Sequence, residues 1–404
     1  MTLVLDGIRV LEVAEYGFVP SAASVLGEWG ADVIKVEHAV RGDAQRGLSS
    51  FGVKPGQDGF TVLWEPFNRS KRSIAVDIAV PEGRDIILEL ASRADVFLTS
   101  FLPAARRKLG LEVADLRAAN LDIIYARGSA NGQKGPEAEV GGFDALSYWM
   151  RTGLGSAASV GQPTILQQPA PGLGDIQSGM SLAGGIAAAL FHRMRTGEAL
   201  EVDVSLLSQG CWTMSSSLIA ANLAGREERP TPDRRTFENP LTNTYKTADG
   251  RWLVFAMMQA DRYWPGLCKA IGHEELIDDP RFVDMPNRAR NAEACISTLD
   301  AIFASRPLAE WQEVLAQHDG PFSIAQRVGD LNRDEQAWAN GYLQDVDYGE
   351  GRKLTMVTSP VQFNGETSTL TRAPEFGEST EEVLLELGHS WADIARFRDV
   401  NAIG

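Results

Sequence analysis

The first forty residues alternate between two hydrophobic periods, and this alternation constrains the fold more than any other feature. Residues 7–13, rich in valine, leucine and isoleucine, are typical of a buried strand, and residues 20–29 follow helical spacing up to Gly30, a residue type that commonly ends helices. Residues 31–37 predict a second strand. A strand, a short helix and another strand make a βαβ unit, which requires a parallel sheet.

The same rhythm continues beyond residue 70 and predicts a Rossmann-like parallel sheet. We expect strands at 72–78, 94–99 and 123–126, and a helix at 81–92 with proline at its start. The turn after the first strand, residues 15–20, lacks the GxGxxG pattern, and the chain has no GxxxxGK[ST] loop. The sequence therefore does not predict an NAD or FAD site in this sheet.

A polar, proline-containing stretch at 226–235 predicts a linker between two domains. After it, residues 243–247 and 252–257 flank the turn residues 248–250, a pattern that indicates a β-hairpin. Helical spacing follows over residues 261–317.

We therefore expect an α/β protein with a large Rossmann-like domain and a smaller α+β domain. The large domain covers 1–225, the small domain covers 236–330, and residues 331–404 form a C-terminal segment that returns to the large domain. Within this segment, residues 357–361 predict a strand and residues 380–387 a final helix.

Composition excludes several classes of function. The formal net charge of −16 disfavours a nucleic-acid partner. The three cysteines have no metal-ligand spacing, so no metal site is predicted. The first residues do not resemble a signal peptide, and no apolar run approaches the roughly 20 residues of a membrane span. We expect a soluble, cytoplasmic protein without membrane partners.

A Pro/Gly-rich loop over residues 169–174 delivers Asp175 to the start of an apolar helix. Asp175 could simply be an N-cap whose carboxylate accepts backbone hydrogen bonds. Alternatively, the helix N-terminus stabilises an anion and keeps its pKa low, which would favour an ionised carboxylate able to attack a carbonyl or remove a proton from carbon. The residues alone leave both interpretations open.

Further motifs, spread over nearly the whole chain, make it similar to the class III CoA-transferases, a family that includes formyl-CoA transferase, carnitine CoA-transferase and the α-methylacyl-CoA racemases. The matching segments are residues 5–11, 30–37, 42–46, 68–74, 81–84, 94–96, 174–180, 239–250 and 373–380. The resemblance implies that Asp175, in the Gly-Asp that opens the helix, is the catalytic aspartate.

The resemblance also implies that coenzyme A binds to the large domain. The candidate contacts are residues at or near the family's CoA-binding positions: His38, Arg46, Arg69, Lys71, Arg72, Phe101, Lys108, Arg127 and Gly174. Cationic side chains would contact the phosphates. For each cation, a surface position or an internal salt bridge is the alternative interpretation.

Two residues separate the transferase and racemase branches. A racemase needs two bases, one on each face of the α-carbon. Phe143 stands where racemases carry a histidine, and Asn243 stands where they carry a glutamate; Glu238 is a possible substitute. We therefore expect CoA transfer from an acyl-CoA donor to an acceptor carboxylic acid through covalent intermediates on Asp175. Racemisation or another isomerisation, and acyl-CoA binding without turnover, remain the alternatives.

The expected transferase needs no prosthetic group, because coenzyme A itself is the substrate. The glycines at 172, 174 and 179 could donate N–H groups to an oxyanion, or could serve turn geometry alone. Residues 156–163 and 257–259 are candidates for the acyl pocket. The family implies a ring-shaped chain in an interlocked homodimer, with which linkers at 226–235 and 328–345 are compatible.

Overall fold

The computed structural model describes residues 2–50, 52–54, 56, 60–227 and 233–404. Contacts divide the chain into two compact units, one made of Met1–Arg229 with Glu335–Gly404 and the other of Pro230–Asp334. Residues 228–232 of the predicted linker at 226–235 lie outside the described residues.

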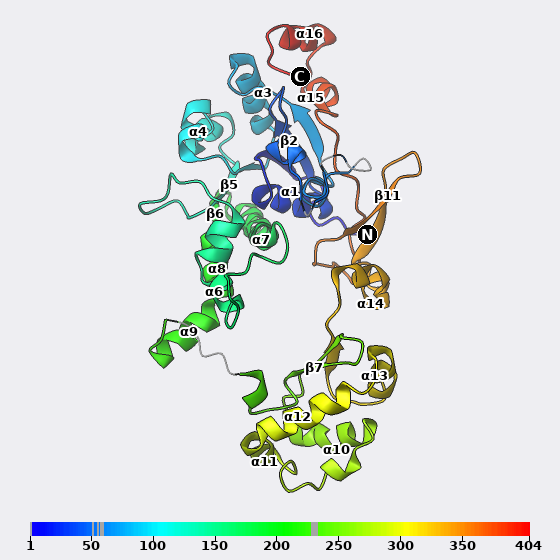
Figure 1. Cartoon of the computed structure of the whole chain (residues 1–404). Helices are drawn as coiled ribbons and strands as arrows, with labels where there is room; N and C mark the ends of the chain where they lie inside the picture. The colour runs from blue at the N-terminus through cyan, green and yellow to red at the C-terminus, as the bar shows by residue number, and fades with distance from the viewer. Residues whose placement is uncertain (1, 51, 55, 57–59, 228–232) are drawn as a thin grey trace. The chain divides into compact units, whose positions relative to one another are not determined.

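The first unit is built on a six-stranded, wholly parallel sheet in the order β3-β2-β1-β4-β5-β6 (Figure 1). The strands are β1 (Arg9–Val13), β2 (Asp32–Glu37), β3 (Arg72–Ala75), β4 (Val96–Thr99), β5 (Ile124–Ser129) and β6 (Glu201–Ser205). The predicted α/β class and parallel sheet are confirmed. Strand order reverses between β1 and β4, and in such sheets ligands bind beyond the carboxyl ends of the strands at this reversal.

Helices cover both faces of the sheet because its strands are apolar on both sides. One face packs against α1 (Phe18–Glu28) and α7 (Leu173–Thr196), with Val19, Leu26, Leu182 and Ile186 fully buried between them. The other face packs against α3 (Pro81–Ser92), α5 (Val113–Ala119), α15 (Thr380–Leu387) and α16 (Trp391–Asp399). The helices predicted at 81–92 and 380–387 are confirmed, and that predicted at 20–29 begins two residues earlier.

Shorter elements complete this unit around the sheet. They are the 3-10 turn η1 (Ala44–Gly47), α2 (Glu65–Asn68), α4 (Pro103–Leu109), the π-helix η2 (Ala145–Met150), α6 (Leu154–Ala158), α8 (Leu206–Thr213) and α9 (Ser215–Ala224). None of the helices in the described part of the chain is both long enough and apolar enough to cross a membrane.

The C-terminal segment contains α14 (Glu335–Ala339) and a hairpin of β10 (Leu343–Asp347) and β11 (Lys353–Val357) before α15. It then runs beside β3: the N–H of Ser379 donates to the carbonyl of Ser73 at 2.8 Å, and the N–H of Asp77 donates to that of Ala402 at 2.9 Å. The segment therefore closes the outer edge of the sheet.

Two predictions for the C-terminal segment are wrong. A strand is expected at 357–361, but the observed strand β11 ends at Val357. The chain turns away there, and the N–H of Ser359 donates to the buried Glu28 carboxylate at 2.7 Å. The helix at 380–387 is not the last, since α16 follows it. The Ser390 and Asp393 side chains form a capping box at the start of α16.

The second unit has its own core. Strands β7 (Thr244–Lys246), β8 (Trp252–Phe255) and β9 (Phe322–Ile324) form an antiparallel sheet, so the predicted hairpin is confirmed. The helices, in the region predicted as helical, are α10 (Ala260–Ala270), α11 (Met285–Arg290), α12 (Ala292–Phe303) and α13 (Leu308–Leu315). Buried aromatic rings, Trp264 and Trp311 among them, fill the space between helices and sheet.

Candidate functional site

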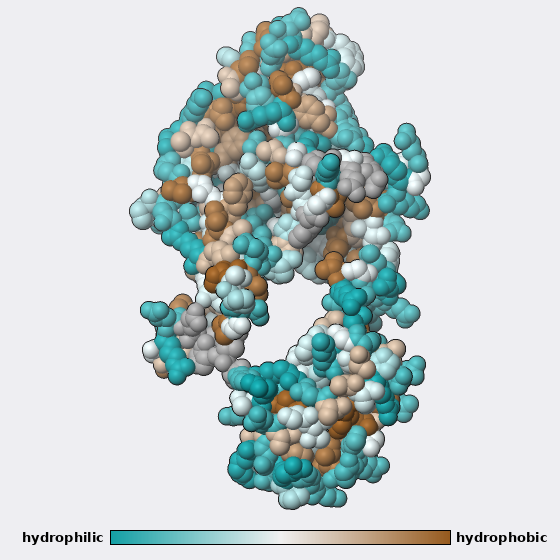
Figure 2. All heavy atoms as spheres, in the orientation of Figure 1, coloured by the Kyte–Doolittle hydropathy of each residue, from teal (hydrophilic) through white to brown (hydrophobic). Residues whose placement is uncertain are grey.

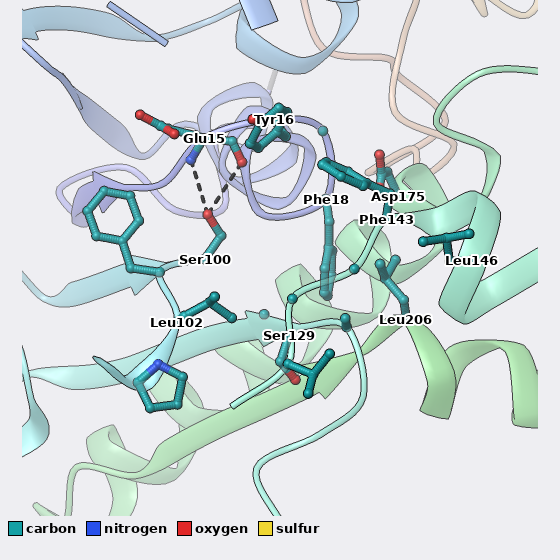
Figure 3. Close-up of a pocket in the computed structure, with 18 of the residues that line it drawn as sticks. Glu15, Tyr16, Phe18, Ser100, Leu102, Ser129, Phe143, Leu146, Asp175 and Leu206 are labelled. Atoms are coloured by element: carbon teal, nitrogen blue, oxygen red, sulfur yellow. Dashed lines mark hydrogen bonds between the residues drawn. The ribbon is translucent and has the colours of Figure 1, made fainter. Parts of the chain in front are cut away.

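Asp175 lies in the first turn of α7, three residues after the N-cap. The N-cap is Gly172, whose φ of +71° favours glycine. The interpretation of Asp175 as the N-cap residue is therefore wrong. Its carboxylate is directed instead toward a cavity (Figure 3).

The cavity has a volume of about 370 Å³ and lies beyond the carboxyl ends of β1, β4 and β5, at the reversal of strand order. We call it the switch-point cavity. Three chain segments that follow these strands line it, together with the loop before η2 and the starts of α7 and α8. The lining includes Glu15, Tyr16, Gly17, Phe18, Ser100, Phe101, Leu102, Pro103, Arg106, Gly128, Val140, Phe143, Leu146, Asp175 and Leu206.

Helices α1 and α7 approach each other closely beside this cavity. The Ser21 hydroxyl, on α1, lies 2.7 Å from the carbonyl oxygen of Phe18 and 3.1 Å from that of Asp175. A Cβ atom added to Gly17 would lie only 2.4 Å from the Asp175 Oδ2. The absence of a side chain at Gly17 therefore gives the Asp175 carboxylate its space.

The environment of Asp175 raises its pKa to about 8. The larger cause is burial, which penalises the charged carboxylate, and the second is the negative charge of Asp144. The expectation of a low pKa at the helix N-terminus is thus wrong, because the loss of solvent and the neighbouring carboxylate outweigh the helix dipole. Perturbed carboxyl groups of this kind are characteristic of catalytic clefts.

Asp144 is held in place by its own hydrogen bonds. Its Oδ2 accepts from the Gln168 side-chain amide at 3.0 Å and from the Gly174 N–H at 3.3 Å. Gly174, predicted to contact coenzyme A, packs instead against the ring of Tyr148, where an added Cβ would lie 2.6 Å from the ring. In this arrangement its N–H serves Asp144 and is not directed to an oxyanion.

Tyr16 occupies the turn between β1 and α1 with a φ of +69°, an uncommon conformation for a residue with a side chain. Its N–H donates to Asp43 at 3.3 Å, and Asp43 also forms a buried ion pair with Lys35 at 2.9 Å. The Tyr16 ring meets the Phe143 ring edge to face, with centroids 5.2 Å apart. The buried ion pair therefore supports a strained turn that forms one wall of the cavity.

A second cavity, of about 270 Å³, shares Glu15 and Phe101 with the first. We call it the His38 cavity, because His38 lines it together with Arg41, Asp77, Ile78, Ala79 and Leu109. His38 lies 4.0 Å from the Asp77 carboxylate. The structure thus brings two of the predicted CoA contacts, His38 and Phe101, to one continuous region of the surface.

Most of the other predicted cationic contacts are engaged within the protein. Arg46 pairs with Glu37 at 2.7 Å and stacks on the Trp64 ring, while Arg69 pairs with the buried Glu28. The Lys71 ammonium is buried, 2.7 Å from Glu12 and within hydrogen-bond distance of two backbone carbonyls. Arg72 pairs with Asp32 at 2.7 Å and with Glu386 at 2.7 Å. For these four residues the salt-bridge interpretation describes the structure.

The last two predicted cationic contacts, Arg127 and Lys108, differ from each other. Arg127, on β5, pairs with Glu201 at 2.8 Å and with Asp203, both on β6, and it does not line either cavity. Lys108 is exposed on α4, the helix that begins with the cavity residue Pro103.

The first of the two segments expected to shape the acyl pocket lies beside another cavity. Ser156 and Val160 line a different cavity, beside α9, and residues 257–259 belong to the second unit. Phe143 lies in the switch-point cavity, so a phenyl ring stands beside Asp175 where a racemase would carry a histidine. Asn243 donates to the carbonyl of Arg234 at 2.9 Å within the second unit. Among the described residues, no group of three or more His, Cys, Asp or Glu side chains could hold a metal ion.

Sequence reasoning missed the contributions of Asp144, Arg41, Leu146 and Leu206. Asp144 directly follows Phe143 in the sequence, and this position is a signal that could have found it. Leu146 and Leu206 give no signal in the sequence, because apolar residues in a cavity wall resemble those of a core.

Comparisons with known proteins show the family and the fold of the chain. A model of the CoA-transferase family III matches residues 5–380. The chain is 31% identical to (R)-2-hydroxy-4-methylpentanoate CoA-transferase of Clostridioides difficile, over 99% of this chain and 100% of that protein. It is 30% identical to cinnamoyl-CoA:phenyllactate CoA-transferase of Clostridium sporogenes, over 97% and 95% of the two chains. The crystal structure of a CAIB/BAIF family protein from Brucella suis superimposes with a TM-score of 0.81 at 26% identity, covering 95% of this chain and 99% of that one.

We predict that Asp144→Asn lowers the pKa of Asp175, because removal of a nearby negative charge stabilises the carboxylate anion. In the unsubstituted protein, the neutral carboxyl should dominate below about pH 8. An NMR titration of the carboxyl carbons in protein labelled at aspartate, with Asp175→Asn to assign the signal, measures the pKa of Asp175 in the unsubstituted protein and in Asp144→Asn.

Asp122→Asn is the matched control. Asp122 precedes β5 at the opposite, amino end of the strands, so its removal should leave the titration of Asp175 unchanged. An unchanged pKa in Asp144→Asn, or an equal shift in the control, would contradict the assignment of the shift to Asp144.

Proposed function

This chain belongs to the CoA-transferase family III, and on that premise we propose that Asp175 is the nucleophile through which it moves coenzyme A from an acyl-CoA to a carboxylic acid. The observation that carries the proposal is the position of Asp175 in the cavity at the switch point of the sheet. Relatives named for 2-hydroxy-4-methylpentanoate and for cinnamoyl-CoA with phenyllactate support carboxylic acids as substrates.

The first half of the reaction transfers CoA to the protein. The ionised form of Asp175, which its raised pKa makes the minor form below about pH 8, attacks the thioester carbon of the donor, and the C–S bond breaks to leave a mixed anhydride and CoA thiolate. The thiolate then attacks Cγ of Asp175. The donor acid departs with one oxygen from Asp175, and an aspartyl-CoA thioester remains.

The second half reverses these steps with the acceptor. The acceptor carboxylate attacks Cγ of the aspartyl thioester and displaces the thiolate, which forms a new anhydride. The thiolate attacks the acceptor carbonyl and releases Asp175, which keeps one oxygen from the acceptor. Burial makes this chemistry favourable because it excludes water from both reactive intermediates.

The racemase alternative has less support. Racemisation needs a second base across the α-carbon, and the cavity presents the Phe143 ring near Asp175. Glu15 is the other carboxyl group among the lining residues, and Figure 3 shows it on the opposite side of the cavity from Asp175.

Coenzyme A would extend from the switch-point cavity into the His38 cavity, since both share Glu15 and Phe101. In this arrangement the Phe101 ring contacts the cofactor near the junction. His38 and Arg41 line the second cavity, and Lys108 stands on α4 as a further cation for a phosphate. Binding energy gathered there would align the thioester with Asp175.

We predict that acceptor acid labelled with ¹⁸O in its carboxyl group will transfer label to Asp175 during turnover, because the released aspartate keeps an acceptor oxygen. Mass spectrometry of the peptide containing Asp175 measures the label. Asp175→Asn should lower the rate of CoA exchange by about 10³-fold or more. Glu15→Gln should still label Asp175. Direct passage of ¹⁸O to the donor acid without labelling of the protein would contradict the covalent route.

We predict that His38→Ala raises KM for acyl-CoA by about tenfold while kcat stays within about twofold, because His38 would contact a part of the cofactor that does not react. Steady-state kinetics with varied acyl-CoA measures this split. His273→Ala, a half-buried histidine of the second unit, is the control and should change neither constant. A fall in kcat with unchanged KM in His38→Ala would contradict the placement.

A homodimer is also expected, interlocked as the family implies. Apolar side chains reach the surface around α8 (Figure 2), and on α8 and α9 Trp212 is 78% and Leu223 85% exposed. Exposed apolar side chains gathered on two successive helices are typical of a protein interface. Light scattering should give twice the mass of the chain, and a Leu223→Asp variant should shift the protein toward monomer; a wild-type mass of one chain would contradict the dimer.

A further inference from the structure

The two ends of the switch-point cavity differ in chemistry. Figure 3 shows Glu15, Ser100 and Leu102 on one side of it. The opposite side, next to Asp175, is formed by Phe18, Phe143, Leu146 and Leu206, and we call this side the acyl end. Since the His38 cavity joins at Glu15 and Phe101, the proposed placement of coenzyme A puts the cofactor on the first side and the acyl group at the acyl end.

The four side chains of the acyl end carry two aromatic rings and two branched alkyl groups. Leu206 is nearly buried at 3% exposure, while Leu146 is 59% exposed and stands at the rim. The Phe143 ring is fixed by its edge-to-face contact with Tyr16. Rings and branched chains of a ligand gain most from such a surface, because both bury apolar area and rings also stack.

No cation faces the acyl end among the described residues that line the cavity. The single basic side chain in the lining is that of Arg106, which is only 4% exposed. Its guanidinium donates to Glu112 at 3.1 Å and to the carbonyl of Phe101 at 3.0 Å, on the cofactor side. A second carboxylate on the acyl group would therefore lie against an apolar wall, without a cationic partner and close to Asp175, which is unfavourable for both charges.

We infer that the acyl group is uncharged and apolar, aryl or branched alkyl, and that acyl groups with a second carboxylate are rejected. The inference rests on the proposed function, because it identifies which end of the cavity holds the acyl group from the position of the nucleophile. It extends that function by excluding one class of acyl group, because the wall of the acyl end offers apolar contact area and no cation to pair with a second carboxylate.

The test compares self-exchange of each donor with its own ¹³C-labelled acid, so that no acceptor has to be chosen. We expect kcat/KM for 3-phenylpropanoyl-CoA and 4-methylpentanoyl-CoA to exceed that for succinyl-CoA by about 100-fold or more. Equal or faster exchange of succinyl-CoA would overturn the inference while leaving CoA transfer intact. Exchange of none of the three donors would overturn the proposed function and the inference with it.

A charge introduced at the rim sharpens the test. Leu146→Arg places a guanidinium beside the acyl end at a position exposed enough to hold it, and should raise exchange of succinyl-CoA by about tenfold while lowering exchange of 3-phenylpropanoyl-CoA. Leu121→Arg, a leucine 79% exposed and outside the cavity, is the matched control and should leave both rates unchanged. Equal effects of the two variants would overturn the inference.

Discussion

The close contact between α1 and α7 is the constraint on which the site depends. It is possible because Gly179 presents no side chain to α1, where a Cβ would lie 1.9 Å from the Ser21 hydroxyl oxygen. Ser21 in turn reaches the carbonyl of Asp175. Small residues at this crossing therefore allow the first turn of α7 to reach the carboxyl ends of the strands, and Asp175 arrives at the switch point as a consequence of helix packing.

The region around Asp175 favours function over stability. Burial and Asp144 both penalise the ionised carboxylate, and Tyr16 adopts an uncommon left-handed backbone conformation. Beneath the turn, Lys35 pairs with Glu12 at 3.0 Å and with Asp43 at 2.9 Å while fully buried. Such an ion pair is costly to desolvate. Because the Asp43 carboxylate also accepts a hydrogen bond from the Tyr16 N–H, the buried charges help to fix the geometry of the cavity wall.

The sequence predicts the helices and the parallel sheet well, but it predicts poorly which charged side chains pair with each other and how their pKa values shift. Hydrophobic periods and proline located α3 and α15 to the residue, since these signals are local. For Arg69 and Lys71 the sequence leaves a ligand contact and a salt bridge equally open, because charge is visible in a sequence and a partner such as Glu28 or Glu12, brought near by folding, is not. Likewise Asp175 could be found, but the sign of its pKa shift depends on burial by other elements and on Asp144.

The return of the C-terminal segment to β3 has a consequence for the order of events during synthesis. The large unit is interrupted by residues 230–334, and Asp77, which bounds the His38 cavity, hydrogen-bonds to Ala402. During synthesis the whole second unit, which has a core of its own, therefore leaves the ribosome before the C-terminal segment can pair with the β3 edge of the sheet. Closing contacts of this sequence separation form late and slowly. The wall of the cavity beside β3 is thus completed only after nearly all of the chain has emerged.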